Sequence, residues 1–259
     1  DQRDGHTYNN GIAQPFVADM DGDSKGDAIF AGDLSGNLWM WKWDSASSAM
    51  KPVLETASHA PSPIFISRAG SVTGDPYAGK LQAITSRPVV GRSNGKTMVF
   101  WGTGKYIETQ DAENRNDSSV TRNITQTIYG LNIDGLTATA TRSDLLQQSI
   151  IAQTTDSNSV EKRAISSNAI PMNKKGWFLD LWGVTNTTTN NTAVALAANN
   201  GGERVTANPY LRFETLVVVS SIPPSDVCSN KGFNWYYELN AFEGVPVDKA
   251  DPSLPNWAD

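Results

Sequence analysis

Short runs of β-branched and aromatic residues, each closed by a cluster of Gly, Pro, Asn or Asp, recur along the whole chain. Such runs favour strands because their side chains pack well on a pleated sheet, whereas the intervening residues favour tight turns. We expect strands at Ala28–Ala31, Asn37–Trp41, Thr97–Trp101, Gln126–Ile133, Trp177–Leu181, Leu216–Val219 and Trp235–Leu239. Only residues 143–150 suggest a short helix, with Ser143 as its N-cap. The pattern therefore predicts an all-β fold.

A short sequence pattern is repeated along the same segments. A proline followed by two apolar residues, a polar turn and then a strand occurs at Pro15–Val17, Pro88–Val90 and Pro209–Leu211. Repeated strand–turn units suit a β-propeller, and about fifteen candidate strands would fill about four blades. Residues 111–122 and 185–191 are polar and predict long loops between strands.

Charge and composition exclude several classes of partner. The formal net charge is −6 and the basic residues do not cluster, which argues against nucleic acid. No apolar run is long enough to span a bilayer, and the first residues, Asp1–Asp4, resemble neither a signal peptide nor an anchor. The single cysteine, Cys228, allows no internal disulfide. It is either a free thiol or bridged to a segment outside this sequence.

The segment that carries chemistry is an acidic loop. Asp19, Asp21, Asp23 and Asp27 occupy positions one, three, five and nine of a nine-residue stretch. Converging carboxylates repel one another, and a hard divalent cation removes that cost. Calcium takes six to eight oxygens and tolerates irregular geometry, whereas magnesium demands an octahedron. We therefore predict a Ca²⁺ site formed by these four carboxylates, the backbone carbonyl of Lys25 and water.

This loop departs from the helical calcium hand in two ways. Its sixth position is Ser24 rather than glycine, and its twelfth is Phe30 rather than a bidentate glutamate. Asp27 would then have to complete the coordination shell. A turn rich in aspartate that binds no metal is the alternative interpretation.

Other motifs favour structural roles. Ala31–Trp39 resembles the tryptophan-docking segment of quinoprotein propeller blades, and blade packing explains it better than cofactor contact. Gly102–Lys105 lacks the pattern of a phosphate loop and predicts a turn. His6 and His59 lie in loop-like surroundings without zinc spacing, and no nucleophile elbow is present. The sequence thus favours a binding module over an enzyme.

The order of motifs carries a resemblance that covers nearly the whole chain. After the acidic loop come AGDLSGNLW, ITSRPVVG, MVFWGTGKYIE, TQTIYG, SDLLQQSI, GWFLDL, GERVTANP, IPPSDVCSNKG and YYELNAFEG. This series resembles the C-terminal domain of the PilY/PilC family of type IV pilus tip adhesins and biogenesis factors. The resemblance implies a modified β-propeller, with residues 1–259 forming its later blades. It also implies an absent N-terminal portion that is von Willebrand A-like in many members.

The same resemblance implies a function. It implies calcium at the acidic loop, with occupancy favouring pilus extension, and a location at the pilus tip or outer surface after export through the periplasm. The implied partners are minor pilins and a host-cell or surface receptor, and the implied roles are adhesion and twitching motility. The alternatives are a quinoprotein dehydrogenase fragment and a lectin-like or integrin-like surface propeller.

Overall fold

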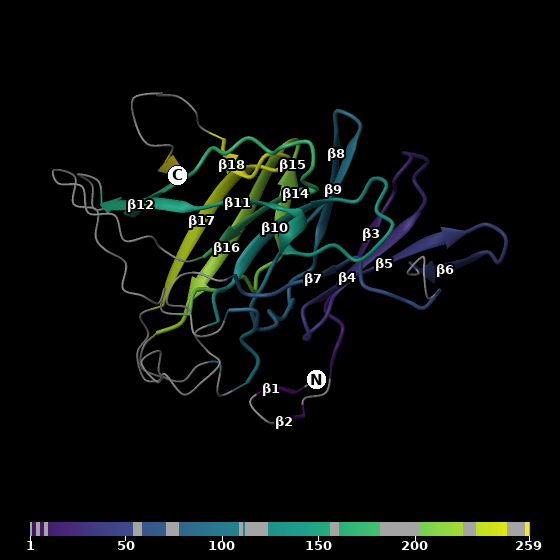
Figure 1. The fold of residues 1–259 in the computed structure, drawn as a ribbon, viewed down its shortest axis with the longest axis horizontal. Coiled ribbons are helices and arrows are strands. Elements are labelled where there is room, and N and C mark those ends of the chain that lie inside the picture. The colour runs from purple at the N-terminus through teal and green to yellow at the C-terminus, as the bar shows by residue number, and fades with distance from the viewer. Residues whose placement is uncertain are drawn as a thin grey trace.

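The computed structural model describes residues 2–3, 6–7, 10–53, 59–70, 78–108, 111, 124–155, 161–181, 202–224, 232–247 and 257–258. Within these ranges the regular structure is almost entirely β-strand, so the all-β prediction is confirmed (Figure 1). No helix in this part of the chain is long and apolar enough to cross a membrane. The side chain of His6, Cys228, the loop 185–191 and nearly all of 111–122 lie outside the described residues.

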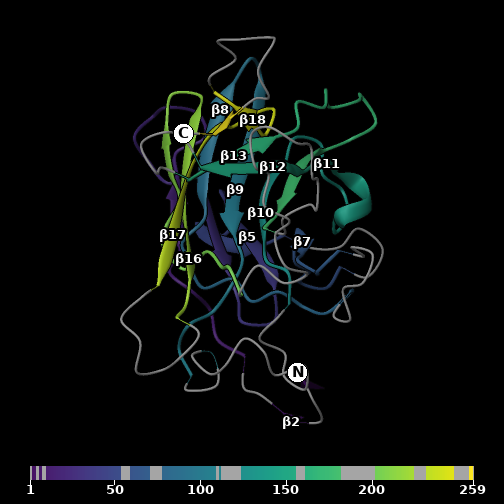
Figure 2. The same cartoon turned by 90° about the vertical axis from the view of Figure 1, so that its left-hand side faces the viewer.

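The strands are β1 (Gln2–Arg3), β2 (His6–Thr7), β3 (Phe16–Ala18), β4 (Ala28–Gly32), β5 (Asn37–Asp44), β6 (Ala49–Pro52), β7 (Phe65–Ile66), β8 (Val89–Ser93), β9 (Lys96–Gly102), β10 (Thr127–Asn132), β11 (Leu146–Gln148), β12 (Ile150–Thr155), β13 (Glu161–Ile165), β14 (Gly176–Asp180), β15 (Tyr210–Arg212), β16 (Thr215–Ile222), β17 (Phe233–Asn240), β18 (Val245–Pro246) and β19 (Trp257–Ala258). They form sheets in the orders β3-β4-β5-β6 with β7 on β5, β11-β14-β10-β9-β8, β12-β13-β19, β15-β16-β17-β18 and β1-β2. Figure 1 shows β4 and β5 to one side of β9 and β10, with β16 and β17 on the other side, and Figure 2 gives the view turned by 90°.

The repeated proline pattern immediately precedes the first strand, in chain order, of three sheets. The apolar pairs after Pro15, Pro88 and Pro209 open β3, β8 and β15, each of which pairs antiparallel with the next strand in sequence. These three strands also lie together, since β8 contacts both β3 and β15. The repeated pattern is therefore structural, and β8 contacts the first strands of two other sheets.

All seven predicted strands are confirmed, but the predicted helix at 143–150 is wrong. Only a 3-10 turn forms there, Arg142–Asp144, and Thr141 precedes it as the cap. The chain then enters β11, which pairs parallel with β14, and continues into β12. Exposure alternates along this segment, with Gln148 and Ile150 buried and Ile151 exposed. Two-residue periodicity and sheet pairing thus override the apparent cap.

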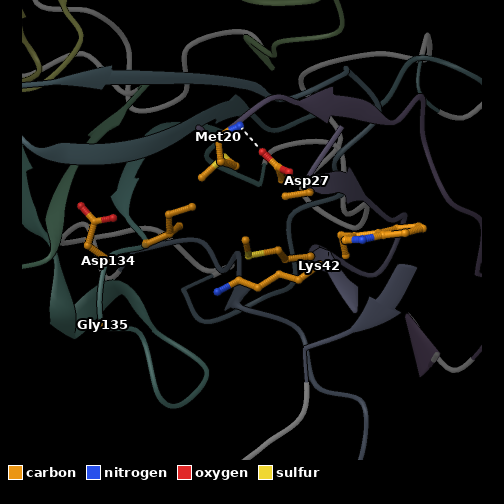
Figure 3. Close-up of a pocket in the computed structure, with 9 residues that line it drawn as sticks. Met20, Asp27, Lys42, Asp134 and Gly135 are labelled. Carbon is orange, nitrogen blue, oxygen red and sulfur yellow. Dashed lines mark hydrogen bonds between the residues drawn. The ribbon is translucent and has the colours of Figure 1, made fainter. Parts of the chain in front are cut away.

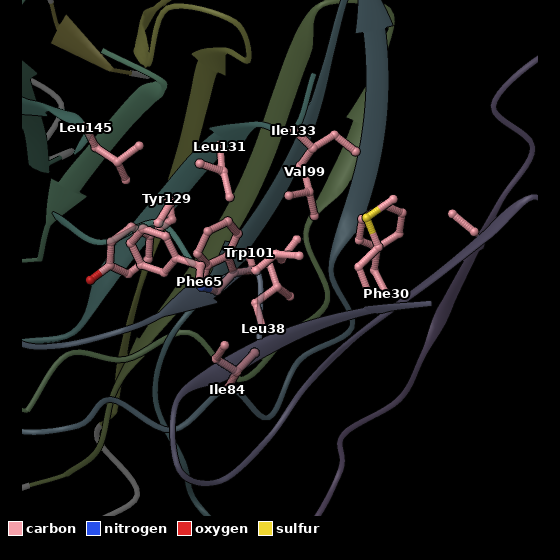
Figure 4. Close-up of a cluster of buried hydrophobic side chains, with 14 of the residues drawn as sticks. Phe30, Leu38, Phe65, Ile84, Val99, Trp101, Tyr129, Leu131, Ile133 and Leu145 are labelled. Carbon is pink, nitrogen blue, oxygen red and sulfur yellow. The ribbon is translucent and has the colours of Figure 1, made fainter. Parts of the chain in front are cut away.

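The β11-β14-β10-β9-β8 sheet is buried on both faces. On one face, Val99, Trp101 and Tyr129 pack against the β4–β5 hairpin and Phe65, with the rings of Trp101 and Tyr129 stacked at 5.0 Å (Figure 4). On the other face, Phe100 and Trp177 belong to a second cluster that reaches β16 and β17. Alternate residues of β9 thus serve different cores, which fixes the neighbouring blades face to face.

Candidate metal centre

The acidic loop connects β3 to β4 at the turn end of their hairpin. The two strands are in register up to Ala18 opposite Ala28, and the amide of Asp27 donates to the carbonyl of Ala18 at 2.9 Å. The strand pairing therefore brings Asp19 and Asp27, the first and last acids of the loop, to neighbouring positions. The intervening residues must turn back within a short distance.

The loop folds around the side chain of Asp19. Its Oδ1 accepts a hydrogen bond from the amide of Gly22 at 2.6 Å, and its Oδ2 accepts one from the amide of Ser24 at 2.7 Å. These bonds favour the carboxylate, and that of Gly22 is the larger cause of the lowered pKa of Asp19. Asp19 is thus held ionised with a fixed orientation.

Two residues turn the loop through the left-handed region. Gly22 has a φ of 88° and Ser24 a φ of 67°. Ser24 occupies the sixth position, where the calcium hand uses glycine to make its sharp turn. The serine adopts a left-handed conformation itself, so its departure from the calcium hand does not prevent the turn.

Three of the four acids converge. Carboxylate oxygens of Asp19, Asp21 and Asp27 all lie within 4.8 Å of one another. Calcium–oxygen bonds measure about 2.3–2.6 Å, so oxygens on opposite sides of one ion stand about 5 Å apart. Asp27 is half-buried and its Oδ2 accepts from the amide of Met20 at 2.7 Å, which leaves the other oxygen for a ligand. The donor set and its spacing fit calcium.

Asp23 differs from the other acids of the loop. Its Oδ1 accepts from the amide of Lys25 at 2.8 Å, and its Oδ2 forms an exposed ion pair with the ammonium of the same lysine at 2.7 Å. Asp23 does not join the converging group among the described residues. Its coordination of a cation, and that of the Lys25 carbonyl, remain predictions.

The Ala31–Trp39 segment forms a turn that is held by hydrogen bonds to the side chain of Asp33. Asp33 is buried and accepts four hydrogen bonds, from the amide of Asn37 and from the side chains of Asn37, Trp39 and Asn10, at 2.8–2.9 Å. Gly36 has a φ of 82°, and a Cβ there would meet the carbonyl oxygen of Gln82 at 2.6 Å. The side chain of Asp33 therefore caps this turn.

Two further sequence motifs take structural positions. Gly104 has a φ of 138°, and its backbone packs so closely against Arg204 that a Cβ would lie 2.5 Å from the arginine's Cβ. This close approach accounts for the glycine in the Gly102–Lys105 segment. His59 is exposed, as expected for a loop histidine.

Comparison with known proteins places these features in a family. The family described as the PilY1 beta-propeller domain matches residues 2–163, which include the whole acidic loop. The chain belongs to this family. It is 28% identical over 260 residues to the type IV pilus biogenesis factor PilY1 of Pseudomonas aeruginosa, covering 91% of the chain and 21% of that protein. It is 27% identical over 243 residues to a PilY1 homolog of Xylella fastidiosa, covering 92% of the chain and 16% of the homolog.

The PilY1 fold is also recognised in a solved structure. The crystal structure of the P. aeruginosa PilY1 C-terminal domain matches with a TM-score of 0.69 and 23% identity, covering 94% of this chain and 49% of that one. The recognition of the family and of its propeller fold from sequence is thereby confirmed. The chain spans about a sixth to a fifth of the length of these relatives.

A pocket that sequence reasoning missed adjoins the acidic loop of this PilY1-family domain. It has a volume of about 450 Å³, and its lining includes Met20 and Asp27 from the loop and Asp134 and Gly135 from the segment after β10 (Figure 3). These pairs lie more than a hundred residues apart in the sequence. No local pattern could therefore have indicated the pocket.

Proposed function

We propose that this chain is the calcium-binding propeller of a type IV pilus biogenesis factor. The observation that carries the proposal is the convergence of Asp19, Asp21 and Asp27 in a loop within the PilY1-family domain. Asp23 and the carbonyl of Lys25 would complete the shell together with water. Asp23 would first have to exchange its exposed ion pair with Lys25 for the cation, which costs little at a solvated site.

The proposed role is binding rather than catalysis. The relatives from P. aeruginosa and X. fastidiosa are pilus biogenesis factors, which supports a pilus-associated location for this chain. We place it at the pilus tip or outer cell surface, where minor pilins and a surface receptor would be its partners. Calcium at the loop would favour pilus extension, adhesion and twitching by holding one end of the β3-β4-β5-β6 sheet in a single conformation.

Calcium-dependent stability tests the metal site. A ligand that binds only the folded state at a hundred times its Kd stabilises that state by about 2.7 kcal/mol. For a domain of this size we expect the midpoint of thermal unfolding to rise by about 5–11 °C on adding calcium to chelated protein. Magnesium at the same concentration is the control and should shift the midpoint less. An unchanged midpoint at millimolar calcium would contradict the site.

A cellular assay tests the pilus role separately. Asp21→Asn in the natural protein of a piliated strain should reduce surface pili and twitching, whereas Lys80→Gln, an exposed change outside the loop, should not. Normal pili and motility with the loop variant, despite its lost calcium response in vitro, would separate calcium binding from the pilus function.

A further inference from the structure

The pocket beside the acidic loop joins three segments of the chain. Met20 follows β3, while Met40 and Lys42 lie on β5, and Ile133 and Asp134 follow β10. In Figure 3, Met20 and Asp27 lie on one side and Lys42 on the opposite side, with Asp134 and Gly135 at one end. The volume of about 450 Å³ lies in the range of pockets that hold compact ligands. It can accommodate one amino-acid side chain together with its backbone.

The base of the pocket is apolar and adaptable. Ala28, Met40 and Ile133 line it and are only 1%, 4% and 8% exposed. Met20 adds a second thioether side chain. Methionine is flexible and polarisable, so paired methionines adjust to different apolar shapes. This base favours an aliphatic or aromatic group.

Lys42 lies at the rim of the pocket, and its positive charge is not balanced by an ion pair among the described residues. Lys42 and Lys51 are directly opposite one another on β5 and β6. The ammonium of Lys51 is 2.5 Å from the carboxylate of Asp44, and chiefly this contact lowers the pKa of Asp44 to about 2. Lys42 is exposed, and its ammonium group has no hydrogen-bond or ion-pair partner among the described residues. Its charge is available to an anionic group of a ligand.

The two carboxylates of the pocket are already engaged with the backbone. Asp27 accepts from the amide of Met20, and Asp134 accepts from the amide of Thr97, both at 2.7 Å. Neither forms an ion pair with Lys42. The rim also carries Trp43, which is 50% exposed although its amide donates to the carbonyl of Asp27 at 2.8 Å. Exposed tryptophan and methionine side chains are typical of protein–protein contact surfaces.

We propose that this pocket receives an apolar side chain of a partner polypeptide, with an adjacent carboxylate of the partner paired to Lys42. The side chain enters between Met20, Met40 and Ile133, and Trp43 covers the neighbouring backbone. The inference goes beyond the proposed calcium site, because none of its contacts requires a cation.

A matched peptide pair tests the proposal by NMR. Acetyl-Leu-Glu-amide and acetyl-Leu-Gln-amide differ only in one charge, and the indole N–H of Trp43, assigned with Trp43→Phe, reports from the rim. We expect the Glu peptide to shift this signal and to bind about two- to fivefold more tightly, as an exposed ion pair allows. Lys42→Gln should abolish the preference, while Lys80→Gln, an exposed control elsewhere, should preserve it.

Three results would overturn the proposal. The first is equal affinity for the two peptides, and the second is a preference for the Glu peptide that survives in Lys42→Gln. The third is a shift of the Trp43 signal by octanoate but by neither peptide, which would indicate that the pocket binds a small amphipathic anion instead. Circular dichroism of each variant confirms that it is folded. The titrations are performed in chelator and repeated in calcium. A failed calcium response therefore leaves the peptide result intact, and the two proposals fail separately.

Discussion

Glu203 in the core and the Asp19–Asp27 loop on the surface both carry negative charge. They differ in where the positive charge that balances it lies. Glu203 is fully buried, and the Arg163 guanidinium, 2% exposed, lies 2.8 Å from its carboxylate. Tyr237 and Ser220 donate further hydrogen bonds to Glu203. In the loop, Lys25 pairs only with Asp23, and no described cationic side chain pairs with the three converging acids.

The difference distinguishes a charge that is balanced within the core from charges that a bound cation could balance. A buried carboxylate must carry its countercharge with it, because an unpaired charge in the core is costly to bury. A surface loop can hold unpaired acids when its amides fix them in place, as Gly22 and Ser24 fix Asp19. Such a loop is ready for an external cation, whereas the Arg163–Glu203 pair is complete.

The largest effect is expected at the buried pair. Arg163→Met should destabilise the domain by about 3–5 kcal/mol, because it leaves Glu203 charged and unpaired in the core. The double variant Arg163→Met with Glu203→Gln should recover part of that loss. Denaturant unfolding in chelator measures both. A loss below about 1 kcal/mol for the single variant would mean that the pair does not carry the stability assigned to it.

A smaller effect should separate the acids of the loop from one another. Asp21→Asn should remove most of the stabilisation by calcium, since Asp21 belongs to the converging group. Asp23→Asn should reduce it less, because Asp23 is engaged with Lys25. Each variant is compared with the parent by its calcium-induced shift in unfolding midpoint. Equal losses in both variants would show that Asp21 and Asp23 contribute equally to calcium binding, as the sequence alone suggested.

The smallest effect concerns pH. The lowered pKa of Asp19 means that its contribution to stability is fully present above the ordinary value of 3.8 and is lost as pH falls through the lowered pKa. In chelator, the difference in unfolding midpoint between the parent and Asp19→Asn should therefore be constant from about pH 7 to 5 and shrink only at lower pH. A difference that changes between pH 5 and 7 would contradict this assignment.

Local patterns predicted the local parts of the fold. The strands around Trp39, Phe100 and Tyr237, the turn capped by Asp33 and the acidic loop all follow from short stretches of sequence, because propensity and turn chemistry act over a few residues. The helix expected at 143–150 failed for the complementary reason. Its apparent cap and short apolar pattern were overridden by pairing with β14, which lies about thirty residues later.

Contacts between distant segments could not be predicted. Arg163 and Glu203 are 40 residues apart, and nothing near either residue indicates the other. The pocket depends on bringing Met20 beside Ile133, and the separation of Asp23 from the other three acids depends on side-chain orientations within the loop. These features arise from packing of the blades and from competition among hydrogen-bond donors.

Anomalous diffraction from crystals grown in calcium tests the central claim most directly. We predict one anomalous peak at the acidic loop, about 2.3–2.6 Å from oxygens of Asp19, Asp21 and Asp27. A fully ordered loop without such a peak at millimolar calcium, with the three carboxylates turned apart into solvent, would contradict it.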